Sequence, residues 1–452
     1  MTQMPAQPAF DPNAPHQQRP RLRQVRAFPA QTQEGQPMLG LTDARQISDK
    51  IVYCSPAVQH VLPLMDGQHD LDAIVKQIGR GLTRPLLENL VAQLESAFLL
   101  EGPAFDALLQ KTRAEFDSSA TLPPAASAAF AEALVQQGVQ QQNEPMPASP
   151  EETAARGAEK MRGVFNQWIT TVVKDAPAFT ALPRAVVAPH LDYGRGWMNY
   201  AATWGRLKGT PRPARVVILG TNHFGFATGV CGCDKGYETP LGVCHADLDL
   251  IAALRRRLGE EQSRRLFEHR FDHEREHSIE LQIPWIQHVF GADDKGEFPK
   301  VMGVLVHDPT ALEGKSYDGK GVDLDAFIEA IRAAISEVSG PTLVVSSADL
   351  SHCGPAFGDQ QKLGGEDKPA VDFRTRVLSH DREMLGFLTS NKPDELLASM
   401  TWQQNPTRWC SIGNLVAAHR ITQPAKVELL NYAGAMDPEG FTFVSSASMV
   451  MT

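Results

Sequence analysis

Four continuous apolar runs stand out in the C-terminal two thirds of the chain. They are rich in β-branched residues, do not alternate with polar positions, and cover residues 184–190, 214–223, 300–308 and 341–352. Strands that are buried on both faces of a sheet have this pattern, and helices lie between them in the sequence. The large C-terminal part is therefore predicted to have an α/β fold, in which helices flank a central, mostly parallel sheet.

The N-terminal part shows the spacing of amphipathic helices instead. Apolar positions between Leu71 and Ile78 follow this spacing, and Thr83 with Pro85 has the composition of a helix start. We predict a small, mainly helical, winged-helix-like domain over residues 20–115. The segments "LMDG", "LDAIVKQIG" and "LVAQLESAFLLEG" resemble PqqD-like domains, in which a helix and a wing form a platform that binds peptides. A helical packing domain without a ligand is the alternative.

Amino-acid composition distinguishes a tail and a linker from the two predicted domains. Residues 1–19 are rich in Pro, Gln and Ala and are predicted to be a disordered tail. The same residues and Ser dominate positions 116–150, which predicts a linker with room for one short helix. The α/β domain then covers 151–452. It opens with a helix, because Ser149 is a good N-cap and Pro150 suits the first helical position.

The overall composition excludes several classes of protein. The formal net charge is -10 over 452 residues, so no basic surface for nucleic acid is expected. No apolar run approaches the roughly 18 residues of a membrane helix, and the N-terminus lacks the apolar core of a secretory signal. The six cysteines are sparse and fit no disulfide framework, which favours a reducing cytoplasm.

A histidine follows each of the four predicted strands: His190, His223, His307 and His352. In open α/β sheets, sites form outside the carboxyl ends of the strands, so parallel strands would bring several of these imidazoles together. Asp349 lies three residues before His352 and could face the same pocket or orient a histidine. Convergent histidines with a carboxylate suit iron, zinc or copper, so a transition-metal site is predicted. The alternative for any single histidine is an ordinary hydrogen-bonded loop group.

Two further histidines form a pattern that is typical of zinc proteases. Residues 273–277, "HEREH", match H-E-x-x-H, in which two histidines one helical turn apart bind zinc and the glutamate acts as a base. The surrounding "RFDHEREH" is heavily charged and lacks the apolar face of a buried catalytic helix. We therefore favour a helix or turn that begins near Ser278, with His277 and Glu280 pointing inward, over a zinc protease.

Six motifs occur in order between about residues 184 and 435: "VVAPHLDYGRG", "VVILGTNHFG", "ETPLG", "EHSIELQIPW", "VVSSADLSHCG" and "LLNYAGA". Together they resemble the Memo family, whose bacterial members are often labelled component B of the AmmeMemoRadiSam system. That family shares its fold with class III extradiol ring-cleavage dioxygenases, which use non-haem iron(II). The resemblance implies an α/β fold with a metal-capable pocket at the edge of its sheet.

The resemblance also implies a set of metal ligands. The family's first two ligands fall on His190 and His223. The third is a cysteine in a Gly-Arg-x-Pro motif that is absent from "NPTRWCSIGNLVAAHR". An ungapped match puts Thr407 in its place, whereas a three-residue deletion aligns Cys410. Iron(II) is the implied metal, with copper or zinc as alternatives, and loss of the thiolate would lower the affinity for soft metals.

Three further residues match polar positions of the family motifs: His277 in "EHSIE", and Asp349 with His352 in the block that follows the fourth strand. In a dioxygenase-type reaction, His352 or His277 would act as a general acid or base and Asp349 would hold its tautomer or bind the metal. A hydrolytic zinc enzyme would use the same residues to activate water.

A different class of function stays open beside the metalloenzyme. The chain could be a non-catalytic module that binds a peptide or protein, since a PqqD-like domain would suit peptide handling. It could also serve a radical SAM or other peptide-modifying enzyme as an accessory protein. The chain contains no Cys-x3-Cys-x2-Cys run, so it is not itself such a radical enzyme.

Overall fold

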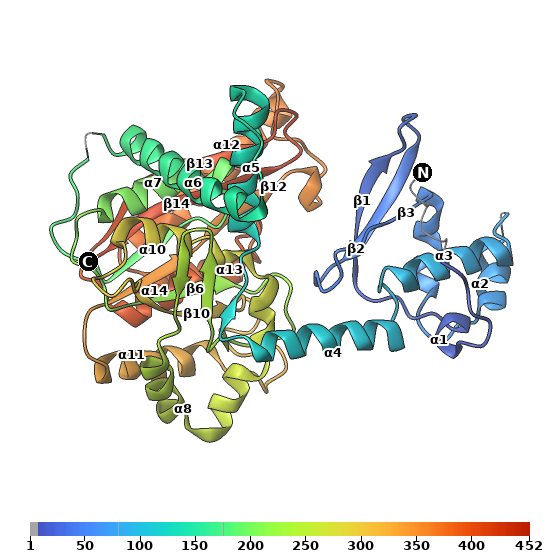
Figure 1. The fold of residues 1–452 in the computed structure, drawn as a ribbon, viewed down its shortest axis with the longest axis horizontal. Helices are drawn as coiled ribbons and strands as arrows, with labels where there is room; N and C mark the ends of the chain where they lie inside the picture. Colours follow the sequence, from blue (N-terminus) through green and yellow to red (C-terminus); the bar gives the residue numbers. More distant parts are fainter. Residues whose placement is uncertain (1–7, 80, 175) are drawn as a thin grey trace. The chain divides into compact units, whose positions relative to one another are not determined.

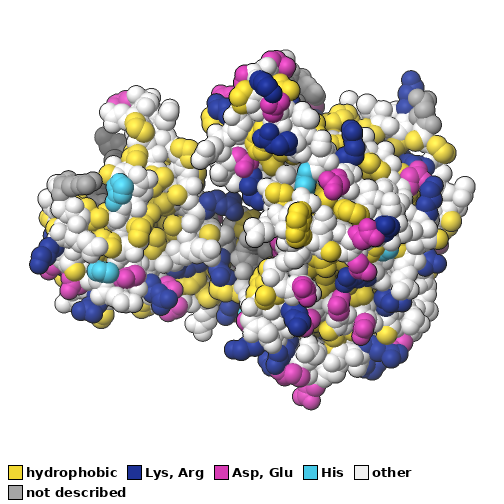
Figure 2. Space-filling model, turned by 180° about the vertical axis from the view of Figure 1, so that it is seen from behind, with side chains coloured by type: hydrophobic (Ala, Val, Ile, Leu, Met, Phe, Trp, Pro, Cys, Tyr) yellow, Lys and Arg dark blue, Asp and Glu magenta, His cyan; other side chains and the backbone are white. Residues whose placement is uncertain are grey.

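The computed structural model of the chain describes residues 8–79, 81–174 and 176–452. The chain forms two compact units, Met1–Ser118 and Ser119–Thr452, which we call unit 1 and unit 2. Figure 1 shows the helices and strands of each unit. Among the described residues, no helix is long and apolar enough to cross a membrane. Figure 2 shows charges of both signs interspersed over the visible face of unit 2.

Unit 1 combines helices with a three-stranded antiparallel sheet in the order β1-β2-β3. Its elements are α1 (Pro15–Gln18), β1 (Val25–Gln31), β2 (Pro37–Asp43), β3 (Val52–Cys54), the 3-10 helices η1 (Pro56–His60) and η2 (Leu62–Leu64), α2 (Leu71–Ile78), α3 (Arg84–Ser96) and α4 (Pro103–Ser118). The predicted helix at 71–78 is present and is capped by Asp70, whose side chain accepts a hydrogen bond from the backbone of Ala73. The sequence patterns missed the β1–β2 hairpin.

The predicted disordered tail is wrong in its second half. Residues 1–7 of that prediction lie outside the described residues. Residues 15–18 form α1, in which Gln17 is buried, and the His16 ring lies 2.9 Å from the carboxylate of Glu95. Phe10 packs against the core of the unit. Average composition predicted disorder because it does not register a few contacts of this kind with a neighbouring helix.

Unit 2 contains a mixed sheet of eight strands in the order β12-β14-β5-β11-β6-β10-β7, with β13 paired to β14. The four predicted strands are β5 (Ala185–Ala188), β6 (Arg215–Thr221), β10 (Lys300–Val306) and β11 (Thr342–Ser347), and they are parallel to one another. The remaining strands of this sheet are β7 (Cys231–Gly232), β12 (Asp349–Cys353), β13 (Val427–Met436) and β14 (Phe443–Met451), which pair antiparallel at its two sides. The predicted α/β fold with helices around a central sheet is confirmed; its four predicted strands are parallel, but the sheet as a whole is mixed.

Helices cover both faces of this sheet (Figure 1). The helices and 3-10 segments of unit 2 are α5 (Ala126–Gln142), α6 (Pro150–Val172), α7 (Tyr193–Leu207), α8 (Leu248–Glu268), η3 (Arg270–Arg275), α9 (His277–Glu280), α10 (Ile283–Phe290), α11 (Leu324–Glu337), η4 (Pro355–Phe357), α12 (Lys368–Thr389), α13 (Pro393–Gln403) and α14 (Ile412–Thr422). A small second sheet joins β4 (Thr121–Leu122), β8 (Gly236–Thr239) and β9 (Gly242–Cys244).

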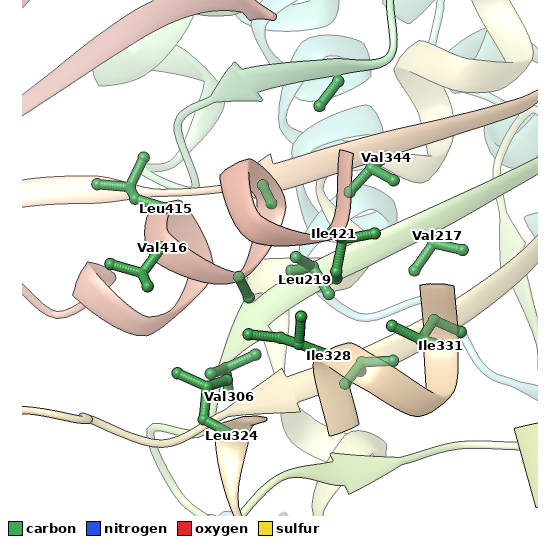
Figure 3. Packing of buried hydrophobic residues seen from close by; sticks show 14 of the residues in the cluster. Val217, Leu219, Val306, Leu324, Ile328, Ile331, Val344, Leu415, Val416 and Ile421 are labelled. Atoms are coloured by element: carbon green, nitrogen blue, oxygen red, sulfur yellow. The ribbon is translucent and has the colours of Figure 1, made fainter. Parts of the chain in front are cut away.

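The core explains why the apolar runs do not alternate. On one face, Val217 and Leu219 of β6 pack against α11 and α14, in a cluster that includes Ile328 and Val416 (Figure 3). On the other face, α7 packs against β5 and β14. All residues of β5 and β6 are buried, so apolar residues occupy both the inward and outward positions along most of each strand, and the polar residues of β6 lie at its two ends.

The predicted linker at 116–150 is also wrong. Most of it belongs to unit 2, and residues 126–142 form α5, which packs on α6. The carboxylate of Glu280 accepts hydrogen bonds from the backbone N–H groups of Ala125, Ala126 and Ser127 at the start of α5, as well as from the Ser127 hydroxyl. A carboxylate at a helix N-terminus is favourable, and Ala and Gln are good helix formers. Composition alone could not reveal this anchor, which lies more than 150 residues away along the chain.

The helix predicted to open the α/β domain is α6, and Ser149 caps it. The Ser149 hydroxyl accepts a hydrogen bond of 3.2 Å from the backbone of Glu152, and Pro150 occupies the first position. The Glu152 carboxylate reaches back to the backbone N–H of Ala148, one residue before the N-cap. The helix start was therefore predicted correctly. The Glu152 carboxylate differs from a standard capping box only in that it bonds to the residue before the N-cap and not to the N-cap itself.

Candidate metal centre

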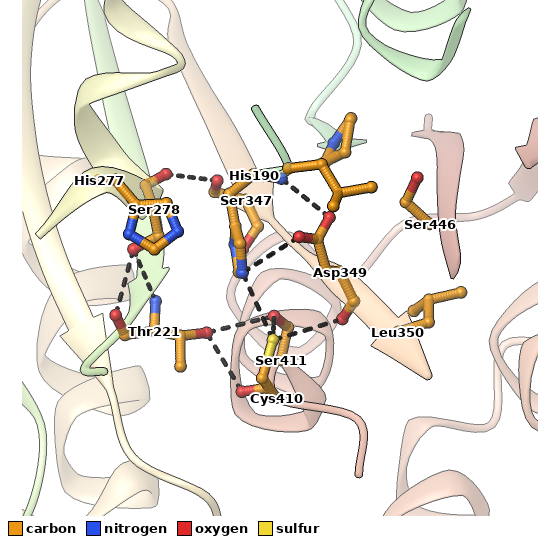
Figure 4. A network of polar contacts seen from close by, with 12 residues as sticks. His190, Thr221, His277, Ser278, Ser347, Asp349, Leu350, Cys410, Ser411 and Ser446 are labelled. Carbon is orange, nitrogen blue, oxygen red and sulfur yellow. Dashed lines mark hydrogen bonds and ion pairs between the residues drawn. The ribbon is translucent and has the colours of Figure 1, made fainter. Parts of the chain in front are cut away.

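Three of the predicted residues meet at the carboxyl edge of the parallel strands. His190 follows β5, His223 follows β6, and Cys410 lies in the loop between α13 and α14. Their potential ligand atoms all lie within 4.8 Å of one another. The sulfur of Cys410 is 3.4 Å from Nε2 of His190 (Figure 4). The parallel arrangement of β5 and β6 around β11 brings the two histidines to the same edge.

His190 is held in the form that binds metals. Its ring is buried, and Nδ1 donates a hydrogen bond of 3.1 Å to the carbonyl of Ser347 at the end of β11. This contact fixes the tautomer and leaves the lone pair of Nε2 directed toward Cys410. Burial, together with the neighbouring His223 and His277, holds the pKa of His190 well below its ordinary value, so the imidazole is neutral.

His223 is oriented by Glu276, a residue that sequence reasoning missed. Its Nδ1 lies 3.0 Å and 3.2 Å from the two carboxylate oxygens of Glu276, which also accepts the backbone N–H of His223 at 2.8 Å. Glu276 is 3% exposed. A carboxylate behind a histidine is the usual outer contact of metal-binding histidines, because it orients the ring and raises its basicity. Its position next to His277 in "EHSIE" was the available signal.

Glu276 and His223 shift each other's pKa. Burial alone would raise the pKa of Glu276, but His223 outweighs it and lowers the value to about 2. Burial alone would lower the pKa of His223, but Glu276 and the thiol of Cys410 raise it well above the ordinary value. Without a metal, Nε2 of His223 therefore carries a proton. A cation at this nitrogen would compete with that proton.

Hydroxyl groups fasten the ends of β6 and β11 to the segment that carries Glu276. The hydroxyl of Ser278 donates to the carbonyl of Thr221 and accepts its backbone N–H, at 3.1 Å and 3.0 Å. The hydroxyl of Ser347 donates to the carbonyl of Ser278 at 2.5 Å (Figure 4). Ser347, at the end of the fourth apolar run, thus has a structural role, because it ties the end of β11 to the segment that Ser278 joins to β6.

A buried carboxylate also shapes the loop that contains His223. Asp272 accepts hydrogen bonds from the side chain of Asn222 and from the backbone of Phe226. Gly225 lies against the same carboxylate, and a Cβ atom there would approach an oxygen of Asp272 to 2.1 Å. Any larger residue at this position would displace the loop and the imidazole it carries.

His277 and Asp349 lie beside the three candidate ligands. The His277 ring centroid is 4.9 Å from that of His223 and 5.6 Å from that of His190. A third of the His277 side chain is exposed. Burial of the rest lowers the pKa of His277 to about 4, so the ring is a neutral proton acceptor at pH 7. Asp349 accepts the backbone N–H of His190 at 3.0 Å, and burial raises its pKa to about 7.

His352 is not among the residues whose potential ligand atoms lie together. Its Nδ1 bonds to the carbonyls of Leu350 and Arg408, and its ring packs edge-on against Phe357. Burial and the nearby His223 lower its pKa. Among the described contacts, His352 therefore belongs to the wall of the site and not to the group of atoms that could share a metal.

The strand-end histidine His307 and His273 of "HEREH" do not form part of the cluster. His307 follows β10 as predicted, but its Nε2 donates to the carbonyls of Gly314 and Lys315, away from the cluster. His273 lies in η3 and bonds to the hydroxyl of Tyr237 and a backbone carbonyl, whereas His277 begins the separate helix α9. The two histidines of "HEREH" are therefore not one turn apart on one helix, which excludes the zinc-protease geometry.

The structure also separates the two candidates for the third ligand. The hydroxyl of Thr407 lies 3.2 Å from Nδ1 of His380, outside the cluster. The sulfur of Cys410 contacts His190 and the hydroxyl of Ser411, and the carbonyl of Asp349 is 3.8 Å away. The alignment with a three-residue deletion is the one that matches the observed geometry.

Fold and site together define an α/β protein with a partly buried cluster of two imidazoles and one thiol at the carboxyl edge of its sheet. A family model described as Memo-like protein matches residues 157–450. The chain therefore belongs to the Memo family.

Individual relatives agree with this assignment. A MEMO1 family protein of Methanopyrus kandleri is 32% identical over 218 residues, which cover 48% of this chain and 69% of that protein. One from Methanothermobacter thermautotrophicus is 28% identical over 265 residues, covering 57% of this chain and 79% of the relative. One from Aquifex aeolicus is 22% identical over 363 residues, covering 78% and 79%.

Proposed function

We propose that unit 2 is a mononuclear non-haem metal oxidoreductase of the dioxygenase type, related to the class III extradiol dioxygenases. Iron(II) would be held by His190, His223 and Cys410, with copper or zinc as the alternatives. The observation that carries the proposal is the convergence of these three ligand atoms within 4.8 Å. The donor set fits such a metal, since imidazole and thiolate suit iron, copper and zinc.

The remaining residues of the site have separate roles in this proposal. Bound iron(II) would supply the redox chemistry with oxygen. Glu276 and the carbonyl of Ser347 orient the two imidazoles. His277 is neutral and partly exposed, which suits a group that accepts a proton from a phenolic substrate. Asp349 holds the backbone at His190, and His352 is a second acid–base candidate at the wall of the site.

The proposal is tested on full-length protein purified anaerobically and reconstituted with iron(II). We expect about one iron per chain, and oxygen uptake in the presence of a set of catechols that stops when the metal is chelated. One metal per chain without oxygen uptake would contradict a dioxygenase. No metal after reconstitution with iron, copper or zinc would contradict the metalloenzyme altogether and leave a binding module.

A second function is favoured by a groove in unit 1. The groove has a volume of about 760 Å³ and runs beside β3, one of the two edge strands of the sheet. Its lining includes Tyr53, Val58, Leu86 and Leu90, and Tyr53 and Leu86 are more than half exposed. Hydrophobic side chains gather on the visible face of this unit (Figure 2). An extended peptide could add to the edge strand and place apolar side chains in the groove, as a PqqD-like domain would require.

Peptide binding is tested by selecting peptides from a displayed random library on the full-length protein. We expect selected peptides to carry alternating apolar residues and to bind a Leu86→Glu variant about tenfold or more weakly. Leu378→Glu, at an exposed position of α12 in unit 2, is the matched control and should bind normally. Equal binding to both variants would contradict the groove as the site.

We also propose a kind of partner enzyme and a cellular location for the protein. If unit 2 is not an enzyme, peptide binding by unit 1 would make the chain a non-catalytic peptide- or protein-binding module accessory to a radical SAM or peptide-modifying enzyme. All six cysteines are free thiols and five of them are buried. This state suits the reducing cytoplasm that we propose as the location of the protein.

A further inference from the structure

Asp381 is a fully buried carboxylate on α12 that the proposed chemistry does not use. It accepts four hydrogen bonds, and each donor is a neutral side chain. Oδ1 accepts from the hydroxyl of Ser351 at 2.5 Å and from the indole of Trp409 at 2.8 Å. Oδ2 accepts from the hydroxyls of Tyr432 and Ser445 at 2.6 Å and 2.5 Å. Such a fully bonded buried carboxylate fixes the segments that supply its donors.

Two of those donors lie next to residues of the metal centre. Trp409 immediately precedes Cys410, and Ser351 immediately precedes His352. The indole N–H of Trp409 also lies 3.1 Å from the hydroxyl of Ser351, so the two segments share one network. The other two donors come from β13 and β14, and neither is adjacent in sequence to a candidate ligand, although the Ser445 hydroxyl also accepts the backbone N–H of Ser351.

The loop that carries Cys410 depends on such anchors. It contains no helix or strand between Gln403 and Ile412, and Gln404, Asn405 and Arg408 have positive φ angles of 58°, 46° and 56°. Few non-glycine residues adopt this conformation unless their surroundings hold them there. The buried indole of Trp409 is 1% exposed, and its only nitrogen donates into the Asp381 network.

We propose that Asp381 is a positioning residue of the metal centre. It holds the thiol of Cys410 against His190 through Trp409, and it supports His352 through Ser351. The metal-dependent part of this inference rests on the proposed function. Asp381 itself touches none of the candidate ligands among the contacts described for it.

The first test measures cobalt(II) binding to the full-length protein, with the thiolate-to-cobalt absorption band as the readout. Asp381→Asn replaces one accepting oxygen with an amide donor, and we expect affinity to fall 10- to 100-fold, as for other outer contacts, with loss of the band. Trp409→Phe keeps the ring but removes the N–H and should act in the same direction. The double variant should bind within about twofold of the weaker single variant, because both remove the same contact.

Tyr432→Phe is the matched control. It removes a hydrogen bond from the other oxygen of Asp381, but Tyr432 has no neighbour in the metal centre. We expect a lower melting temperature with unchanged cobalt affinity and an unchanged absorption band. A purely structural role of Asp381 would instead give Asp381→Asn and Tyr432→Phe the same losses of stability and leave cobalt binding intact in both, which would overturn the inference.

A second test needs no metal. Cys410 is the one cysteine that is not buried, so the rate of alkylation by iodoacetamide in metal-free protein reports its position. We expect Asp381→Asn and Trp409→Phe to raise this rate several-fold and Tyr432→Phe to leave it unchanged. If wild-type protein binds no metal, the proposed function fails while this rate still decides the role of Asp381. If Asp381→Asn does not fold, Trp409→Phe decides, and an unchanged rate there contradicts the inference.

Discussion

Replacing His190 with alanine is expected to remove stoichiometric metal from the protein. The imidazole is buried, neutral and oriented by Ser347, so its Nε2 is the best prepared of the candidate ligand atoms. Outer contacts of a metal site are worth about 10- to 100-fold in affinity, and loss of a ligand must cost more than that. The measurement is elemental analysis of anaerobically purified variants beside the wild type.

Cys410→Ser and His307→Ala complete this experiment. Cys410→Ser should also lose metal, and copper more strongly than iron, because the thiolate is the soft ligand. His307 follows a parallel strand as His190 does, but its ring bonds to backbone carbonyls outside the cluster. His307→Ala should therefore retain its metal. Metal loss in His190→Ala with full retention in Cys410→Ser would move the third ligand to Asp349, whose carboxylate lies 3.5 Å from Nε2 of His190.

The second large effect concerns the stability of unit 2. Asp247→Asn is expected to lower the free energy of unfolding by about 3–5 kcal/mol, the usual result of removing one partner from a buried ion pair. Asp247 is fully buried, and its carboxylate lies 2.5 Å from Nε of Arg215 at the start of β6. The same carboxylate caps α8 by accepting the backbone N–H of Leu250. The variant would leave the buried guanidinium with neutral partners only, which include the carbonyls of Ser339 and Gly340 and the hydroxyl of Thr342.

Urea unfolding followed by tryptophan fluorescence measures this effect. All six tryptophans lie at or beyond position 168, so the signal reports on unit 2 alone. The matched control is Glu261→Gln, which removes ion pairs with Arg264 and Arg265 on the exposed surface of α8 and should leave the midpoint unchanged. Equal midpoints for Asp247→Asn and wild type would show that the buried pair contributes nothing net.

Much of the fold was predictable because it depends on local patterns. A strand buried on both faces is apolar at most positions and does not alternate, so β5, β6, β10 and β11 were visible as continuous runs. Capping residues such as Ser149 act within one helical turn, so the start of α6 was visible too. The regions judged by average composition were mispredicted, since α5 depends on a single distant carboxylate, Glu280.

The sequence by itself determined the α/β fold, the parallel strands and the histidines that follow them, because strand burial and strand ends are properties of short segments. Only the tertiary structure decided between Cys410 and Thr407, removed His307 from the site and added Glu276 and Asp381. Those choices depend on contacts between segments up to 220 residues apart in the chain, as for Cys410 and His190. The spacing of residues along the chain does not specify such distances, whereas packing of the elements around the sheet does.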